Sequence, residues 1–503
     1  MHTRRDQVQA HTFMVGRLVS ALLRGEPDLA TPPLRRTTVG LLVGCILGVI
    51  AVGGFTVYGF IRPSQSTAWR HPGTLIVDRQ TGTRYVLAGG RLHPVLNYAS
   101  ARLLLGRSMT VALVPADTLA AVPRGGPVGI PGAPDALPAN TGSGPGSGTG
   151  SGPTRWLVCA GRAAGATGVA GAQAPTVSVR IGPDDGAQPL PADRAVLARD
   201  AGGTTYLVWR GSRLRLAAPW VGRALGYDTS AALPVRGGWL GVLPAGPDLG
   251  PPAVAHRGAP GPVLDGRPTV VGQLFGVPDP TGTAGDRHLY LLTANGLQPV
   301  SDTEATLVLA DPAGTAAYGG HAAAVRGLSP GALAGARVLP TQADAAALPT
   351  APPALLADPA RSPCVRVLAG GDQAVSLATV PATGTALAAA PVAAAPAPGT
   401  PASGAATSGA ADRIDVAPGS GALVRPRAPG TAGPDQAGPD QVAPACYLLT
   451  EDGALFPVAD AAAAGDLGYD PDAAVGVPAN LLALLPVGPA LSRLRPGGGA
   501  GPP

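Results

Sequence analysis

The chain has 503 residues, too many for one ordinary hydrophobic core, so we expect more than one packed unit. Its 73 glycines and 57 prolines, against 4% aromatic residues, indicate many turns and linkers and few large core side chains. Of the net charge of +5, +3 lies in residues 1–37 (six arginines less three acids), and no basic stripe is interleaved with aromatic residues, so nucleic acid is not an expected partner.

Residues 1–38 form a tail that has the pattern of an amphipathic helix. Five positions recur at helical spacing with arginines between them: Val8, His11, Val15, Leu18 and Leu22. Such a helix lies on the inner membrane surface or docks on a partner protein, and we favour docking.

Residues 39–61 follow as 23 positions without a charge. As a helix they would span about 35 Å, enough to cross the hydrocarbon core of a bilayer. A secretory signal peptide has a shorter apolar stretch and a small-residue cleavage site, which this segment lacks. We therefore predict one retained transmembrane helix. A small excess of arginine before it favours a cytoplasmic N-terminus and an extracytoplasmic C-terminal region.

Gly40, Gly44 and Gly48 line up along one side of this predicted helix. Missing side chains let another helix approach closely, which predicts a packed partner helix. The alternative is that glycine is simply common in this chain and in membrane helices.

The region beyond the helix contains internal repeats. Residues 204–249 and 444–491 align with few gaps and share the run Leu-Gly-Tyr-Asp, and weaker copies occur at 83–106 and 288–310. In every copy a tyrosine, taken as the repeat anchor, precedes a leucine by 19 or 20 residues: Tyr85, Tyr206, Tyr290 and Tyr447.

Each copy predicts a small ββα module, because a β-rich run, a glycine turn and a second β-rich run lead into a short helical pattern. The copies are unevenly spaced, so we expect them to decorate a central β core. The candidate core strands are Trp156–Cys159, Val177–Ile181, Val270–Leu274, Val365–Leu368 and Ala422–Val424. The expected fold is thus one transmembrane helix followed by an α+β, mostly β extracytoplasmic region with four ββα modules.

The expected domain organisation follows from these segments. We expect four repeats, at 68–139, 202–250, 286–350 and 444–492. The central core is expected in three parts, at 156–201, 251–285 and 360–425, the last with an Ala/Pro-rich insertion. A Gly/Ser linker at 140–155 and a flexible tail at 493–503 complete the chain after the helix.

Four cysteines are present, one of them, Cys45, inside the apolar segment. Cys159, Cys364 and Cys446 lie far apart with no CxxC spacing, so no zinc site is expected. One long-range disulfide and buried unpaired thiols both remain open from spacing alone.

Catalytic motifs are not evident. The chain contains no lysine, so it has no P-loop, and the glycine run at 142–152 is typical of a linker. The one GxSxG match has Pro330 where a nucleophile elbow needs a backbone N–H. We therefore expect no catalytic, cofactor-binding or metal-binding residues, with an unfamiliar ATP site as the alternative.

Three long runs resemble the EccB family of type VII (ESX) secretion proteins: RRDQVQAHTFMVGRLVSALLRGEPD at 4–28, AWRHPGTLIVDRQTGTRYVLAGGRLHPVLNYASARLLLG at 68–106, and VPRGGPVGIPGAPDALP at 122–138. The resemblance implies a structural and assembly subunit of the secretion membrane complex, crossing the inner membrane once. Its implied partners are EccC, EccD, EccE, the mycosin protease and other copies of itself in the periplasm.

The resemblance also implies alternatives and a covalent link. Some family members are described as ATPases, and the repeats resemble cell-wall-binding modules, so ATP hydrolysis and peptidoglycan contact are the alternative functions. A family disulfide implies that Cys159 pairs with Cys364, while Cys446 has no assigned partner.

Overall fold

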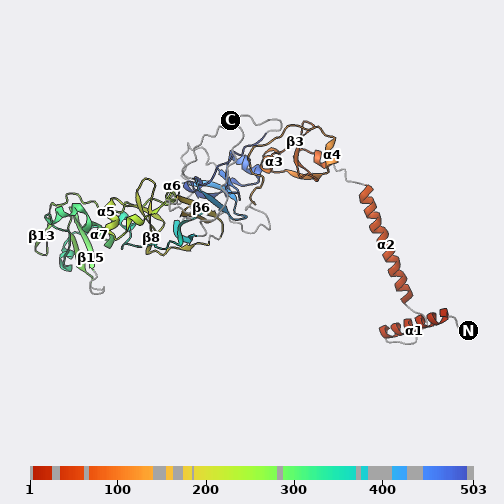
Figure 1. Cartoon of the computed structure of the whole chain (residues 1–503), viewed down its shortest axis with the longest axis horizontal. Coiled ribbons are helices and arrows are strands. Elements are labelled where there is room, and N and C mark those ends of the chain that lie inside the picture. Colours follow the sequence, from red (N-terminus) through yellow and green to blue (C-terminus); the bar gives the residue numbers. More distant parts are fainter. Residues whose placement is uncertain are drawn as a thin grey trace, which may run out of the picture. The chain divides into compact units, whose positions relative to one another are not determined.

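The computed structural model describes residues 4–24, 34–61, 67–139, 155–162, 174–183, 186–279, 287–369, 375–382, 410–427 and 446–494 (Figure 1). The chain divides into two compact units, Met1–His71 and Pro72–Pro503. Nearly all of the expected Gly/Ser linker, most of the expected Ala/Pro-rich insertion and most of the expected C-terminal tail lie outside the described residues.

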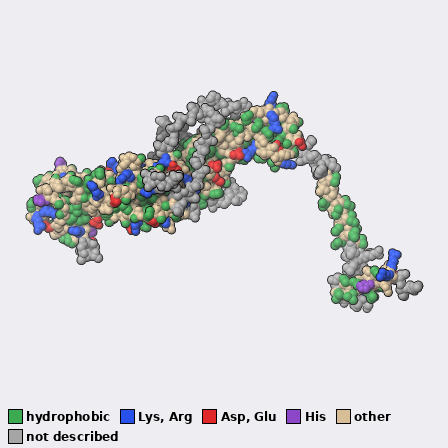
Figure 2. Space-filling model, in the orientation of Figure 1, with side chains coloured by type: hydrophobic (Ala, Val, Ile, Leu, Met, Phe, Trp, Pro, Cys, Tyr) green, Lys and Arg blue, Asp and Glu red, His purple; other side chains and the backbone are tan. Residues whose placement is uncertain are grey.

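The described part of the first unit contains two long helices and one turn of 3-10 helix, which are α1 (Arg4–Arg24), α2 (Leu34–Ile61) and η1 (Thr67–Arg70). The window Val39–Val57 of α2 has a mean hydropathy of 2.3, and none of it is buried within the protein. Figure 2 shows green hydrophobic and tan side chains, without blue or red ones, along the coloured part of this helix. Within the described residues, α2 alone is long and apolar enough to cross a membrane.

The second unit is built around a six-stranded sheet, the central sheet. Its strands are β5 (Arg155–Arg162), β6 (Pro175–Ile181), β7 (Gln188–Pro189), β19 (Arg361–Leu368), β20 (Val375–Pro381) and β21 (Arg413–Val416), in the order β21-β6-β5-β19-β20-β7. The β5 side chains alternate between two buried faces, with Trp156 and Val158 on one and Leu157 and Cys159 on the other. Burial on both faces explains its nearly continuous apolar sequence.

Four further sets of elements, which we call groups 1 to 4, make up most of the rest of the described part of this unit. Group 1 consists of β1 (Thr74–Asp78), β2 (Arg84–Ala88), β3 (Arg91–Pro94), α3 (Tyr98–Leu105), β4 (Thr110–Val114) and α4 (Ala116–Ala120). Group 2 consists of β8 (Arg194–Arg199), β9 (Thr205–Trp209), β10 (Ser212–Arg215), α5 (Pro219–Ala224), η2 (Thr229–Ala231), β11 (Leu233–Pro234) and α6 (Gly237–Val242).

Groups 3 and 4 have the same chain order. Group 3 consists of β14 (Leu274–Pro278), β15 (Arg287–Thr293), β16 (Gly296–Val300), α7 (Asp302–Ala310), η3 (Pro312–Tyr318), β17 (Val325–Gly327), α8 (Pro330–Gly335) and α9 (Ala343–Ala346). Group 4 consists of β22 (Ala422–Arg427), β23 (Cys446–Leu449), β24 (Leu455–Val458), α11 (Ala461–Leu467), η4 (Pro471–Ala473), β25 (Val475–Pro478) and α12 (Ala479–Leu482). The remaining strands are β12 (Pro260–Leu264), β13 (Arg267–Val270) and β18 (Ala354–Leu355).

Every group has the same strand order, third-second-first-fourth. The first three strands form an antiparallel meander, and the fourth lies parallel to the first, which requires a crossover carrying the helix. The chain then returns along the third strand through isolated bridges, such as Leu92 with Arg124 and Leu455 with Val487. Each group is therefore larger than the predicted hairpin and helix.

Two predicted core strands were assigned to the wrong sheet. Val270 ends β13 in a separate two-stranded sheet and Leu274 begins β14 of group 3, while Ala422–Val424 begins β22 of group 4. A short buried apolar run has the same sequence pattern in any sheet, so periodicity does not reveal the sheet to which it belongs.

Groups 2 and 4 share one hydrophobic core with the central sheet. Trp239 of α6 is buried there, and its Nε1–H donates to the Val158 carbonyl oxygen of β5 over 3.1 Å. Asn480 of α12 donates from Nδ2 to the Gly241 carbonyl oxygen over 2.6 Å. The helices that follow the fourth strands of groups 2 and 4 thus meet over the central sheet.

Candidate functional site

Groups 1 and 3 are held by two contacts of the same design. Helix α3 packs on α11, where Ala99 and Leu103 join a buried cluster with Ala463 and Leu467. Helix α7 packs on α5, beside which it lies in Figure 1, and Leu307 joins a buried cluster of group 2. Group 1 therefore docks on group 4, and group 3 docks on group 2.

A buried tyrosine completes each contact. The Tyr469 hydroxyl donates to the Pro138 carbonyl oxygen over 2.7 Å, and the Tyr227 hydroxyl donates to the Pro353 carbonyl oxygen over 2.9 Å. Tyr469 is 5% exposed and Tyr227 is 7% exposed. We call these two pairs the tyrosine clamps, and they join residues that lie 331 and 126 positions apart in the chain.

The shared Leu-Gly-Tyr-Asp sequence explains how each clamp tyrosine is positioned. Gly226 and Gly468 follow α5 and α11 with φ of 78° and 101°, a conformation that glycine adopts without a steric penalty. The aspartate after each tyrosine then caps the next 3-10 helix; Asp470, for example, accepts from the Asp472 N–H. The tyrosine therefore lies between the glycine that ends one helix and the aspartate that caps the next, and its side chain enters the interface between groups.

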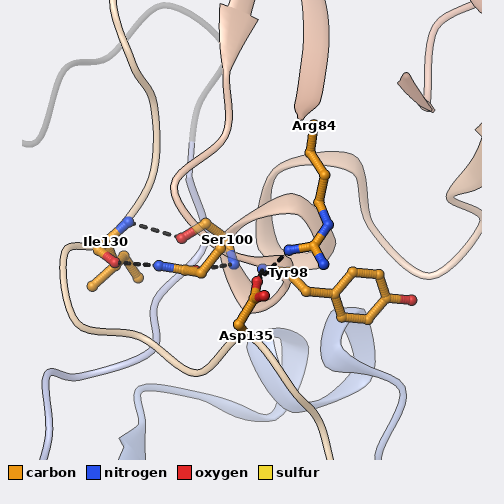
Figure 3. A network of polar contacts seen from close by, with 6 residues as sticks. Arg84, Tyr98, Ser100, Ile130 and Asp135 are labelled. Atoms are coloured by element: carbon orange, nitrogen blue, oxygen red, sulfur yellow. Dashed lines mark hydrogen bonds and ion pairs between the residues drawn. The ribbon is translucent and has the colours of Figure 1, made fainter. Parts of the chain in front are cut away.

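The acceptor side of one clamp is held by a polar network in group 1 (Figure 3). Asn97 accepts from the Ser100 N–H and donates to the Ile130 carbonyl oxygen, while the Ile130 N–H donates to the Ser100 hydroxyl. Asp135 accepts from the Tyr98 N–H and forms an ion pair with Arg84. The four hydrogen bonds have N···O distances of 2.8–2.9 Å. Together with the ion pair they fix residues 130–135, just before Pro138, against the start of α3.

Burial suppresses ionisation of the clamp tyrosines. It raises the pKa of Tyr227 from 10.0 to about 12, and it raises the pKa of Tyr469 as well. Because the folded pKa exceeds the unfolded one, the stabilisation is complete below pH 10 and is lost as pH rises from 10 through 12. We expect the melting temperature to fall across this window, and to fall less in a Tyr227→Phe/Tyr469→Phe variant. Equal slopes in both proteins would contradict this origin.

The return segments of groups 1, 2 and 4 share a close glycine contact with the third strand, which predicts that a larger residue there destabilises the fold. A Cβ added at Gly488 would overlap the Phe456 ring of β24, as Cβ atoms at Gly125 and Gly246 would overlap His93 and Leu214 of the other third strands. Gly488→Ala is expected to lower the free energy of unfolding by about 1–3 kcal/mol through overpacking. Gly465→Ala in α11 is the matched control, because its Cβ would meet nothing within 4 Å among the described residues. Thermal unfolding of both variants is the measurement, and equal stability would contradict the prediction.

The structure places the other predicted site residues as follows. Cys159 and Cys364 lie directly opposite each other on β5 and β19 and form a disulfide. Gly40, Gly44 and Gly48 lie on α2, and a Cβ at any of them would meet no described atom within 4 Å.

The four repeat-anchor tyrosines take equivalent positions on the second strands, each opposite a first-strand residue and a third-strand residue, and all are half-buried: Tyr85, Tyr206, Tyr290 and Tyr447. Tyr206 and Tyr447 pack against the core that groups 2 and 4 share with the central sheet. Sequence reasoning missed Tyr227 and Tyr469, although a signal was available. Leu-Gly-Tyr-Asp occurs only in the copies that receive another group.

Several described charged residues join separate elements: Arg102 of α3 donates to the Leu467 carbonyl oxygen over 3.3 Å, and Arg236 forms an ion pair with Asp412. A cavity of about 600 Å³ lies between group 2 and the central sheet, lined mostly by aliphatic side chains. Its Arg361 donates to Thr379 and its Asp358 accepts from the Ala360 N–H. Ser329, of the GxSxG match, caps α8. Among the described residues, no three His, Cys, Asp or Glu side chains gather closely enough to hold a metal ion.

Known proteins share this architecture. The chain is 31% identical over 316 residues to the "ESX-3 secretion system ATPase EccB3" of Mycobacterium tuberculosis (strain ATCC 25618 / H37Rv), a match that covers 60% of this chain and 56% of the relative. The chain thus spans little more than half the length of that relative. It also resembles a chain in "Structure of an intact ESX-5 inner membrane complex, Composite C3 model", with a TM-score of 0.65 and 27% identity, covering 98% of this chain and 94% of the other.

A second solved structure has the same fold. The chain in "Structure of EccB3 dimer from the ESX-3 core complex" gives a TM-score of 0.61 at 26% identity and covers 83% of this chain and 98% of its own. The profile of the family described as "Type VII secretion system ESX-1, transport TM domain B" matches residues 1–495. With nearly its whole length matched, this chain belongs to the EccB family of type VII secretion proteins.

Proposed function

We propose that this chain is a structural and assembly subunit of a type VII (ESX) inner membrane complex. The observation that carries the proposal is the likeness to a chain of the intact ESX-5 inner membrane complex, which extends over 98% of this chain. In this proposal α2 crosses the inner membrane with α1 in the cytoplasm, and Pro72–Pro503 braces the periplasmic side. EccC, EccD, EccE and the mycosin protease are the proposed partners.

Groups 1 to 4 are, in this proposal, four copies of one module that extends the predicted ββα unit by a first strand, a parallel fourth strand and a return segment. Their common strand order and their equivalent glycines support it. Two copies, groups 2 and 4, pack on the central sheet, and the tyrosine clamps attach groups 3 and 1 to them. A body of four groups joined in this way offers several surfaces to partner subunits, which suits bracing.

Affinity isolation of the complex from native membranes tests the proposal. Tagged full-length chain should retain EccC, EccD and EccE. Gly44→Leu should reduce their recovery, because Gly40, Gly44 and Gly48 form the proposed packing face of α2. Gly53→Leu is the matched control, since Gly53 lies on the opposite side of a helix with 3.6 residues per turn. Recovery of the chain without these subunits would refute the assembly role.

ATP hydrolysis is the second candidate, because the curated relatives carry ATPase in their names. It requires turnover by the purified full chain that a single substitution abolishes without unfolding the protein. An absence of such turnover in the isolated complex would favour the structural role.

A further inference from the structure

Strand β4 is an unusual edge. It ends the group 1 sheet, in the order β3-β2-β1-β4, and it contains no charged residue. Val111 and Leu113 are 56% and 61% exposed, and they pair in register with Leu75 and Val77 of β1, on the same face. Proteins normally shorten, charge or cover such edges, so an uncharged aliphatic edge indicates that something binds it.

The other groups do not have this feature. The groups can be aligned through the first-strand residue that lies opposite each repeat-anchor tyrosine. In that alignment the position of Leu113 is taken by Pro234 in group 2, Gly327 in group 3 and Gly476 in group 4. In groups 2 and 4 the fourth strands pack on the shared core. The exposed aliphatic pair therefore belongs to group 1 alone, and the common fold does not require it.

Positive charge flanks this strand at both ends. Arg79 is exposed, and its N–H donates to the Val114 carbonyl oxygen over 3.0 Å, while exposed Arg107 comes three residues before Thr110. The neighbouring Asp78 is buried and accepts from the Gln80 N–H and the Thr81 hydroxyl, bonds that keep it inside its own turn. The exposed acid nearby is Asp117 of α4. Figure 2 shows blue, red and green side chains interspersed over group 1.

The chain also limits where group 1 lies. Thr74 follows Ile61, the last residue of α2, by 13 positions, so an extended connection spans roughly 45 Å at most. Groups 2 to 4 begin far later in the sequence. Residues 67–139 hold seven arginines and three aspartates, a net charge of +4. An aliphatic strip flanked by arginines, tethered to a membrane helix, matches the chemistry of an anionic lipid surface.

We propose that Arg79, Arg107, Val111 and Leu113, the β4 surface, bind the anionic phospholipid headgroups of the bilayer that α2 spans. This inference rests on the proposed function, because it requires α2 to be inserted. The arginines meet the headgroup phosphates and the two aliphatic side chains enter the boundary with the acyl chains. Group 1 is then fixed to the membrane surface at a second point besides α2.

Hydrogen–deuterium exchange of the full-length chain in nanodiscs tests the β4 surface. Residues 107–114 should exchange about 25-fold more slowly in discs of phosphatidylcholine with phosphatidylglycerol than in discs of phosphatidylcholine alone, since each of the two arginines contributes about fivefold to binding an anionic surface. Arg79→Gln/Arg107→Gln should remove the difference. Arg223→Gln/Arg267→Gln removes the same charge from α5 of group 2 and from β13, and it should preserve the difference. Residues 475–478 should exchange equally in both discs.

Three results would contradict these proposals, and each would contradict them in a different way. Equal exchange of residues 107–114 in both discs, with α2 protected, would overturn the β4 surface and leave the proposed function standing. Protection that follows the number of chains per disc, and not lipid charge, would show β4 paired with a second copy and would overturn it too. Free exchange along α2 would overturn both proposals.

Discussion

Replacing Tyr469 by alanine is expected to lower the free energy of unfolding by about 3–5 kcal/mol, as is typical for a buried aromatic side chain. Tyr469 fills the junction between group 1 and group 4 and donates to the Pro138 carbonyl oxygen. Its removal leaves a cavity and an orphaned carbonyl at the contact where α3 of group 1 packs on α11 of group 4. The measurement is chemical denaturation together with hydrogen exchange of α3, which should accelerate.

Conservative variants separate packing from the hydrogen bond. Tyr469→Phe keeps the ring and should cost about 1–3 kcal/mol for the unsatisfied carbonyl. Tyr290→Phe is the matched control, because Tyr290 is half-buried and its hydroxyl has no acceptor among the described residues. If α3 in Tyr469→Ala exchanged as slowly as in the native protein, the clamp would not hold group 1 in place.

Removal of the Cys159–Cys364 disulfide should lower the free energy of unfolding about as much as Tyr469→Ala does. Cys159 and Cys364 are separated by 205 positions, and closing so long a loop contributes up to about 5 kcal/mol in the chain-entropy model. The two residues join neighbouring central strands on which groups 2 and 4 pack. Cys159→Ala/Cys364→Ala should therefore lower the melting temperature of the whole Pro72–Pro503 unit.

A matched control uses another cysteine of the same unit. Cys446 begins β23 and is not in a disulfide, so Cys446→Ala should change stability far less. Reducing agent should destabilise the native chain and leave the double variant unchanged. A double variant as stable as the native chain would show that strand pairing alone holds the central sheet.

Local patterns allowed part of the fold to be predicted. The hydropathy of residues 39–61 predicted the helix, although α2 begins earlier, at Leu34. The alternating runs around the four repeat-anchor tyrosines coincide with hairpins in the structure, because strand and turn signals are contained in about a dozen residues. Trp156–Cys159 and Val365–Leu368 were expected in one sheet and are neighbours in it. The Cys159–Cys364 pairing came from family resemblance, since spacing left it open.

Non-local features could not be predicted in this way. The parallel fourth strands carry two to five residues each, too few for a reliable period. The docking of group 1 on group 4 depends on Tyr469 reaching a carbonyl 331 positions away, and a main-chain acceptor leaves no sequence signature. The repeated Leu-Gly-Tyr-Asp was visible, but the reason for its restriction to groups 2 and 4 becomes clear only when their docked partners are seen.

The proposed function requires that α2 cross the membrane, with α1 and Pro72–Pro503 on opposite sides of it. Labelling of intact cells and of permeabilised cells with a membrane-impermeant maleimide tests this most directly, using Gln9→Cys in α1 and Ala294→Cys in the exposed turn between β15 and β16. The chain without an added cysteine controls for Cys446. We predict labelling of Ala294→Cys once the outer envelope is opened, and of Gln9→Cys only after the inner membrane is breached. Labelling of both positions under the same condition would contradict the account.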